Sequence, residues 1–222
     1  MREKTFILAR PEARVLEWIA HRLPRRVMPD HLTALGVLAA IGIAVAYLLS
    51  NRDPAWLWAA SGLLVVHWLG DSLDGTLARV RRTERPRYGY YLDHLVDAIA
   101  TALIGIGLGL SPYMLLASGL IIVVAYLVLS INTYLETNTL GVFSLGYGRL
   151  GPTEARLGLV AMNTVLALGL VPSFTVAGLG LGVLDVVALV VAALMLGGLG
   201  VRAARNLREL ARLEPPSPQA AP

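Results

Sequence analysis

Four aspartates in two adjacent apolar segments are the residues best suited to chemistry in this sequence. Asp71 and Asp74 are three residues apart, a spacing that places both on one face of a helix. Asp93 and Asp97 are four apart and share a face in the same way. Ionised carboxylates at membrane depth are costly, so a cluster of four requires nearby cations. Carboxylates hold Mg²⁺ together with substrate phosphates, and two such ions can stabilise both oxygens of a displacement at phosphorus.

The residues that follow the first aspartate pair fit an anionic ligand. Gly75 leaves the helix surface without a side chain, so a bulky group can approach the backbone. Arg79 lies about one turn later, where its guanidinium can contact a phosphate. Arginines within 80–87 add positive field. A structural pairing of helix-end carboxylates with arginines is the plain alternative, and it gives no reason for four aligned aspartates.

A divalent-cation transporter is the competing functional class, because intramembrane carboxylates can also coordinate an ion in transit. Transport favours carboxylates near the bilayer midplane on broken helices. In this sequence the aspartates lie beside an arginine-rich segment, at one side of the membrane. That position favours an anionic phosphate substrate.

Composition defines the setting of these residues. Of 222 residues, 56% are hydrophobic and 15% charged, and the mean hydropathy is +0.64, so we expect an all-α polytopic membrane protein. The absence of cysteine excludes disulfides, zinc-thiolate sites and thiol nucleophiles. Six apolar segments of about 20 residues or more are long enough to cross the bilayer. They lie near residues 31–50, 55–80, 88–110, 112–137, 153–172 and 178–203.

The segments before and after the predicted spans are expected to form a surface helix and a disordered tail. Residues 1–26 lack a secretory signal, and 12–23 form an expected amphipathic helix on the membrane surface. Its apolar side consists of Val15, Leu16, Ile19 and Leu23. Asp30 is placed to cap the first span. Residues 27–205 are expected to form one membrane domain, and 206–222 a disordered cytoplasmic tail.

Basic residues predict the orientation. With six spans, 18 of the 19 Lys and Arg residues fall on one side, and Arg52 alone lies opposite. Because cytoplasmic loops are enriched in Lys and Arg, both termini and the aspartate site are expected to be cytoplasmic, in the cell inner membrane. No basic patch with interleaved aromatic residues is present, so a nucleic-acid partner is not expected.

The aspartates belong to a longer pattern. Asp71-x2-Asp74-Gly75-x2-Ala78-Arg79, then nine residues, then Gly89-x3-Asp93-x3-Asp97 resembles the signature of the CDP-alcohol phosphotransferase family of membrane enzymes. The family usually has eight residues between the arginine and the second glycine. The extra residue falls in a segment that contains Pro86, where an insertion alters little beyond the shape of a loop.

The resemblance implies transfer of a substituted phosphate from a CDP-alcohol to a second alcohol, one of them a lipid, with release of CMP. It implies a homodimer and two Mg²⁺ or Mn²⁺ ions. The implied metal ligands are Asp71, Asp74, Asp93 and Asp97. Asp97 and Asp93 are the implied catalytic residues, with Asp97 as the general base. Gly75, Ala78 and Arg79 would line the CDP site, Gly89 would allow close helix packing there, and Glu154 with Arg156 would hold a polar substrate.

Two short segments bear on the subgroup. The segments 92–98 (LDHLVDA) and 151–157 (GPTEARL) are similar to the choline and ethanolamine phosphotransferase branch, in which diacylglycerol accepts the headgroup phosphate. We therefore favour that branch from sequence. Branches in which CDP-diacylglycerol donates to inositol phosphate, glycerol phosphate or serine share the same aspartate motif and stay open.

Other polar or small residues have structural interpretations. His67 is expected to make an interhelical hydrogen bond, and glycines 105, 107 and 109 to allow close helix packing. Residues 132–136 either lie at the interface or line a polar pocket. Asp185 lies inside the sixth segment, and its spacing offers no account of it.

Overall fold

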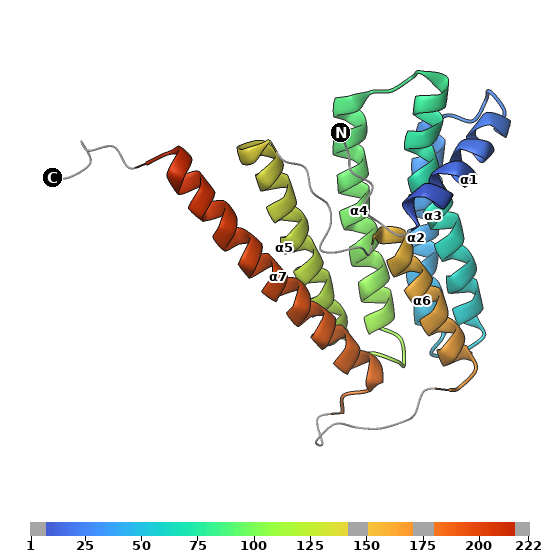
Figure 1. Cartoon of the computed structure of the whole chain (residues 1–222). Coiled ribbons are helices and arrows are strands. Elements are labelled where there is room, and N and C mark those ends of the chain that lie inside the picture. Colours follow the sequence, from blue (N-terminus) through green and yellow to red (C-terminus); the bar gives the residue numbers. More distant parts are fainter. Residues whose placement is uncertain (1–7, 142–150, 171–179, 216–222) are drawn as a thin grey trace.

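A computed structural model describes residues 8–141, 151–170 and 180–215. Within these ranges the chain is helical (Figure 1). The helices are α1 Ala9–Arg22, α2 Pro29–Leu49, α3 Trp56–Arg81, α4 Pro86–Gly109, α5 Leu116–Leu140, α6 Pro152–Ala167 and α7 Val183–Leu213. The all-α prediction is confirmed, and the six apolar segments correspond in order to α2 through α7.

Four of these helices, α2, α4, α5 and α7, are long and apolar enough to cross a membrane. Helix α3 is 26 residues long, but its C-terminal half carries the charged groups of the aspartate motif. Helix α6 has only 16 residues. The structure therefore supports an integral membrane protein with four candidate spans among the described residues, and the six-span arrangement remains a proposal.

The helices pack in a fixed order. Helix α2 lies between α3 and α4, α6 packs on α3, and α5 joins α4 to α7. Figure 1 shows α5 and α7 side by side on one flank, away from α6. Helices α2, α3 and α6 also share a buried polar link, in which Tyr47 donates to Asn163 and Asn163 donates to Ser61, at 3.1 and 3.2 Å.

Small residues allow the close crossings that were predicted. A Cβ built on Gly107 would lie 2.6 Å from Cα of Ala44, so α4 and α2 meet backbone to backbone. A Cβ on Gly119 would lie 2.7 Å from the carbonyl oxygen of Gly105, which brings α5 equally close to α4. Gly109 also contacts the start of α5. The predicted role of the α4 glycines is confirmed.

Helix α1 uses its apolar side differently from the prediction. Leu16 and Ala20 are buried in a cluster with Leu73 and Leu77 of α3, whereas Val15 is exposed. Much of the side expected to face lipid therefore packs on protein. A position of α1 at the membrane surface is not tested by these contacts and remains a prediction.

The start of α2 corrects a second expectation. The N-cap is Met28, not Asp30, and Pro29 occupies the first helical position. Proline suits that position because its φ is preset and the missing N–H needs no partner. Asp30 lies in the first turn, and its carboxylate pairs with Arg85, just before α4.

The end of α7 differs from a third expectation, that of a disordered tail from residue 206. The helix continues to Leu213, so residues 206–213 are helical rather than part of a disordered tail. Arg205, Arg208 and Arg212 recur at helical spacing on one side, with Leu210 on the other, a pattern typical of an amphipathic helix. The remaining tail residues, 216–222, lie outside the described part.

Asp185 is explained by the tertiary structure. It is 2% exposed, in the first turn of α7. One carboxylate oxygen accepts from the backbone N–H of Gly182 and the other from that of Leu115, both at 2.8 Å. Asp185 therefore caps the starts of two neighbouring helices, α7 and α5.

Replacing this double cap should destabilise the α5–α7 pair. We expect Asp185→Ala to lower the free energy of unfolding by about 1–2 kcal/mol or more, since loss of one cap costs about 0.5–2 kcal/mol. Asp185→Asn keeps one acceptor oxygen, so its free energy of unfolding should lie between those of the wild-type protein and Asp185→Ala. Thermal unfolding in detergent, followed by circular dichroism, measures this. Equal midpoints for all three proteins would contradict the double cap.

Candidate active site

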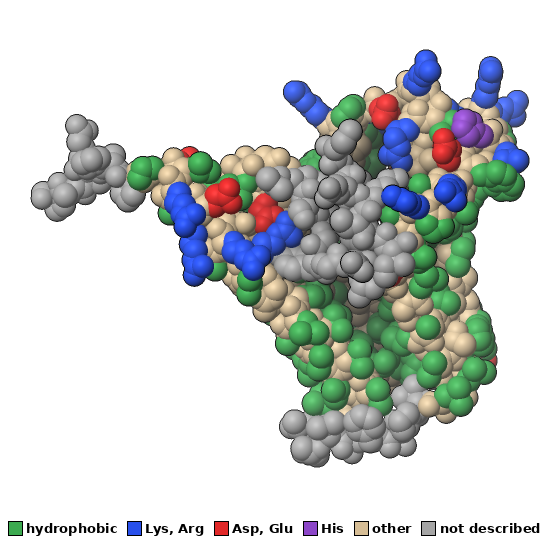
Figure 2. Space-filling view, in the orientation of Figure 1, with side chains coloured by type: hydrophobic (Ala, Val, Ile, Leu, Met, Phe, Trp, Pro, Cys, Tyr) green, Lys and Arg blue, Asp and Glu red, His purple; other side chains and the backbone are tan. Residues whose placement is uncertain are grey.

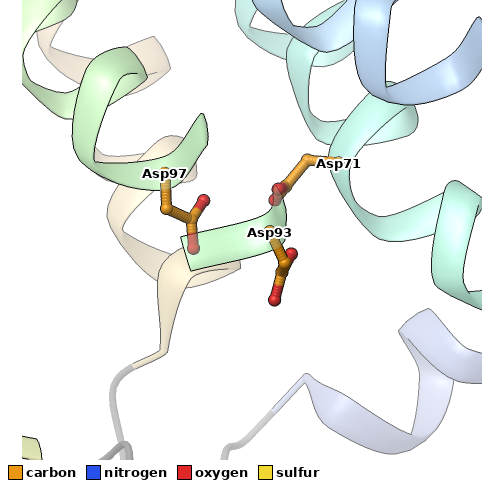
Figure 3. Close-up of side chains that lie close together, drawn as sticks. All are labelled: Asp71, Asp93 and Asp97. Atoms are coloured by element: carbon orange, nitrogen blue, oxygen red, sulfur yellow. The ribbon is translucent and has the colours of Figure 1, made fainter. Parts of the chain in front are cut away.

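Three aspartates converge where α3 faces α4. Asp71 projects from α3 toward Asp93 and Asp97 of α4 (Figure 3). One carboxylate oxygen of each lies within 4.8 Å of the others. The side chain of Asp71 is 17% exposed and that of Asp93 is 49% exposed, so the cluster opens at one edge. The sequence predicts a cluster of four carboxylates, and the structure brings three of them together.

The connection between α3 and α4 sets this geometry. Arg82 ends α3 in the left-handed conformation, with φ of 57°, and the N–H of Thr83 donates to the carbonyl of Ala78. This αL ending reverses the chain within residues 82–85. The nine residues between the motif halves therefore lie mostly in helices, and the two aspartate pairs are joined by a short turn.

Asp74 faces a different neighbour. Its carboxylate accepts a hydrogen bond of 2.6 Å from the hydroxyl of Thr33 on α2, and one from the backbone N–H of Gly75. Asp74 is not part of the group formed by the other three carboxylates. Its role as a metal ligand remains a prediction. Thr33 was not identified from sequence, because nothing in the sequence shows that α2 faces this turn of α3.

A basic residue from α6 completes the described cluster. Arg156 donates to the carboxylate of Asp71, and its side chain is 14% exposed. His67, one turn before Asp71, is 4% exposed, and its Nδ1 has no hydrogen-bond partner among the described residues. The hydrogen bond predicted for His67 is thus not made through Nδ1.

The predicted CDP-site residues lie along the last turns of α3. Arg79 is exposed, and its Nη2 donates to Thr76 at 2.9 Å. Its Nη1 would lie 3.5 Å from a Cβ on Gly75, so the guanidinium lies beside the bare helix surface there. Ala78 is half-buried on the same turns. These positions leave the CDP-binding assignments as predictions.

Gly89 requires a correction. A Cβ built on it would meet no atom within 4 Å, so Gly89 does not allow a close helix crossing within the described part of the chain. The reason is its place in the exposed first turn of α4, next to the equally exposed Tyr88 and Tyr90. No atom of the described residues therefore occupies the space beside Gly89.

Glu154 holds backbone groups. One oxygen accepts from the N–H of Gly151, the N-cap residue of α6, and the other accepts from the N–H of Leu8 at 3.0 Å. Its assignment to a polar substrate stays a prediction. The structure shows that it anchors the first turn of α6, the turn that precedes Arg156.

A second buried ion pair lies between α5 and α7. Glu136 is 5% exposed and pairs with Arg202, and Asn206 also donates to it. Residues 132–136 are expected from sequence either to lie at the membrane interface or to line a polar pocket. For Glu136 this contact supports neither expectation, because its carboxylate pairs with a residue of α7. Its partner is 66 residues away in the sequence, so spacing alone could not reveal it.

Fold and site together define a helical integral membrane protein with an oxygen-ligand site suited to divalent cations and phosphate. The model of the CDP-alcohol phosphatidyltransferase family matches residues 26–197, and the chain belongs to this family.

Two characterised relatives match in sequence. A phosphatidylinositol phosphate synthase from Cutibacterium acnes is 32% identical over 99 residues, which cover 44% of this chain and 45% of that protein. A CDP-diacylglycerol–glycerol-3-phosphate 3-phosphatidyltransferase from Cereibacter sphaeroides is 35% identical over 100 residues, covering 43% of this chain and 44% of that one. The match therefore spans less than half the length of each relative.

One solved structure is similar over most of both chains. It is the crystal structure of Mycobacterium tuberculosis phosphatidylinositol phosphate synthase with CDP-DAG bound. The TM-score is 0.59 at 25% identity, and the match covers 83% of this chain and 93% of that one.

These relatives do not support the choline and ethanolamine branch that the short segments favoured. The structure explains why those segments misled. Residues 92–98 contain the two α4 aspartates that the whole family motif shares. Residues 151–157 contain Glu154, which caps α6, and Arg156, which pairs with Asp71. Both segments therefore contribute residues to the aspartate cluster or to the start of α6, so a short match within them does not identify the branch.

Proposed function

We propose that this protein transfers a phosphatidyl group from CDP-diacylglycerol to the hydroxyl of a polar acceptor such as inositol phosphate or glycerol phosphate. The acceptor oxygen bonds to the phosphorus that carries diacylglycerol, the bond from that phosphorus to the oxygen of CMP breaks, and CMP leaves. The observation that carries this proposal is the convergence of Asp71, Asp93 and Asp97 within 4.8 Å in a member of this family. The named activities of the relatives support the choice of donor.

The donor set fits a hard divalent cation. All three converging ligands are carboxylates, and Mg²⁺ or Mn²⁺ prefers such oxygen ligands. Asp71, Asp93 and Asp97 would hold the metal, with Asp74 as the fourth ligand of a proposed two-ion site. When bound, the ions would neutralise the diphosphate and stabilise charge on the departing CMP.

Other steps are assigned to side chains of the protein: proton transfer, donor binding and acceptor binding. Asp97 accepts the proton of the attacking hydroxyl, as a general base. Arg79 contacts a phosphate of the donor, beside the open surface at Gly75 and Ala78. Arg156, held by Asp71, offers its remaining N–H groups to the acceptor's phosphate, with Glu154 fixing the turn that carries it.

The proposed topology has six spans, α2 to α7, with both termini and the site cytoplasmic. Helix α3 is about 39 Å long at 1.5 Å per residue, enough to cross about 30 Å of hydrocarbon, whereas the shorter α6 needs its neighbours or local thinning. Figure 2 shows basic side chains gathered at one end of the molecule and mainly hydrophobic ones below them. This supports a cell inner-membrane protein whose site meets the cytoplasm, and a homodimer is proposed from the family.

The test is CMP release by the purified protein in lipid vesicles with Mg²⁺. The donors are CDP-diacylglycerol, CDP-choline and CDP-ethanolamine, each with inositol phosphate, glycerol phosphate, serine or diacylglycerol. We expect CMP only with CDP-diacylglycerol and a polar acceptor. Release with CDP-choline or CDP-ethanolamine and diacylglycerol would overturn the donor assignment. No release from any pair, together with Mn²⁺ flux into vesicles, would favour the transporter.

Replacing Arg156 is expected to raise the affinity for a metal ion but to lower the rate of turnover. Arg156→Gln removes a positive charge next to Asp71, so the carboxylate cluster should bind Mn²⁺ severalfold more tightly, as measured by electron paramagnetic resonance. Turnover should fall on the order of tenfold or more, because the acceptor phosphate loses a guanidinium. Weaker Mn²⁺ binding would mean that Arg156 organises the ligands more than it opposes the ion's charge. Arg52→Gln, on the far side, is the control.

A further inference from the structure

Glu12 of α1 contacts the two helices that carry Asp71 and Arg156. Its Oε1 accepts hydrogen bonds from Nε1 of Trp68 at 2.8 Å and from the hydroxyl of Thr153 at 2.9 Å. A third, longer contact of 3.4 Å comes from Ser72. Trp68 and Ser72 are on α3, and Thr153 is in the first turn of α6. We call Glu12, Trp68, Ser72 and Thr153 the Glu12 cluster.

The two ends of this cluster are adjacent to the site. Ser72 follows Asp71 directly, and Thr153 lies three residues before Arg156, within one helical turn. Arg156 and Asp71 form the ion pair described above. The Glu12 cluster therefore spans the same two helices as that ion pair, from the side of α1.

A reciprocal contact strengthens the attachment. Thr153 of α6 donates to Glu12 of α1, and Glu154 of α6 accepts from the N–H of Leu8, just before α1. Glu12 and Glu154 each lie in the first turn of their own helix, where the dipole favours a carboxylate. The first turns of α1 and α6 are thus joined in both directions.

From this geometry we infer that Glu12 is a positioning residue, which holds the first turn of α6 against α3 and thereby sets Arg156 opposite Asp71. Glu12 touches no reacting group. Its effect on catalysis rests on the proposed function, whereas its effect on the spacing of α3 and α6 does not. Misplacement of a catalytic contact by about 1 Å can cost on the order of 100-fold in rate.

The first test measures the α3–α6 spacing directly. The chain has no cysteine, so cysteines introduced at the exposed Val65 of α3 and Leu157 of α6 can carry two spin labels. Double electron–electron resonance on the full chain in vesicles should show a longer or broader distance distribution in Glu12→Ala. Glu12→Gln should retain the wild-type distribution, because all three contacts use one oxygen, Oε1, which the amide keeps. Glu17→Ala, an exposed glutamate on the same helix, is the matched control.

The second test separates positioning from general stability. In the CMP assay, Glu12→Ala should lower kcat about 10- to 100-fold with the KM for CDP-diacylglycerol little changed, and Glu12→Gln should restore it to within about threefold of wild type. In an Arg156→Gln background, Glu12→Ala should add little, since both act through the same contact. Should Glu12→Ala fail to fold, Thr153→Val removes only the α6 donor and should shift the distance and kcat in the same direction.

Three results would overturn the inference: an unchanged α3–α6 distance in Glu12→Ala and Thr153→Val, equal defects in Glu12→Gln and Glu12→Ala, or fully multiplicative effects of Glu12→Ala and Arg156→Gln. Absence of CMP release by the wild-type protein would instead refute the proposed function. The distance measurement would still decide the role of Glu12 in that case.

Discussion

Asp97→Asn is expected to lower CMP release by on the order of 10²–10⁴-fold, the usual contribution of a general base. The amide cannot take the proton of the attacking hydroxyl, but it has nearly the same shape and keeps one oxygen toward Asp71 and Asp93. We therefore expect the variant to fold and to retain Mn²⁺ binding with reduced affinity. Initial rates of CMP formation and Mn²⁺ titrations on the same preparation measure the two effects separately.

The matched control for Asp97→Asn is Asp53→Asn, which makes the same chemical change at an exposed residue between α2 and α3. It should leave CMP release unchanged. If Asp97→Asn turns over at a normal rate, Asp97 is not the base. If both activity and Mn²⁺ binding disappear while the protein stays folded, its main role is as a metal ligand.

Gly70→Ala is expected to destabilise the protein through one added methyl group. A Cβ at this position would lie 2.6 Å from the backbone nitrogen of Gly36 and 2.7 Å from the carbonyl oxygen of Leu32. These atoms belong to the backbone of α2, so α2 and α3 must move apart. Overpacking of this kind costs about 1–3 kcal/mol, and sometimes more. The hydrogen bond from Thr33 to Asp74 crosses the same interface, so CMP release should fall as well.

Gly62→Ala is the control for this change, because a Cβ on Gly62 of the same helix meets no atom within 4 Å among the described residues. Alanine is the better helix former, so this variant should be as stable as wild type or slightly more stable. Thermal unfolding in detergent and CMP release measure the pair. Equal stability of the two alanine variants would contradict the close crossing of α2 and α3.

Features that depend on local spacing were predictable. Spacings of three and four put Asp71 with Asp74, and Asp93 with Asp97, on single helix faces, because the helical period is the same in any context. The apolar segments located α2 to α7 to within a few residues at most of their described ends, since helix length follows from the run of apolar residues. The exceptions are the end of α7, where arginines and leucines continue the helix beyond the predicted span, the later starts of α5 and α7, and the earlier end of α6.

Contacts between distant segments were not predictable. Arg156 is 85 residues from Asp71, and Thr33 is 41 residues from Asp74. Asp185 had no explanation until the N–H of Leu115 was found against it. A single chain gives no signal for such pairs, because they depend on which helices are neighbours and how each is rotated about its axis.

The sequence by itself determined an all-helical membrane protein, its family motif and the four aspartates on two helix faces, because these follow from periodicity and hydrophobicity along the chain. Only the tertiary structure decided that Asp71, Asp93 and Asp97 meet, that Asp74 turns toward Thr33, and that α1 reaches over α3 to α6 through Glu12. The reason is physical. Buried polar groups must find hydrogen-bond partners, and close packing at small residues such as Gly70 selects which helices can supply them.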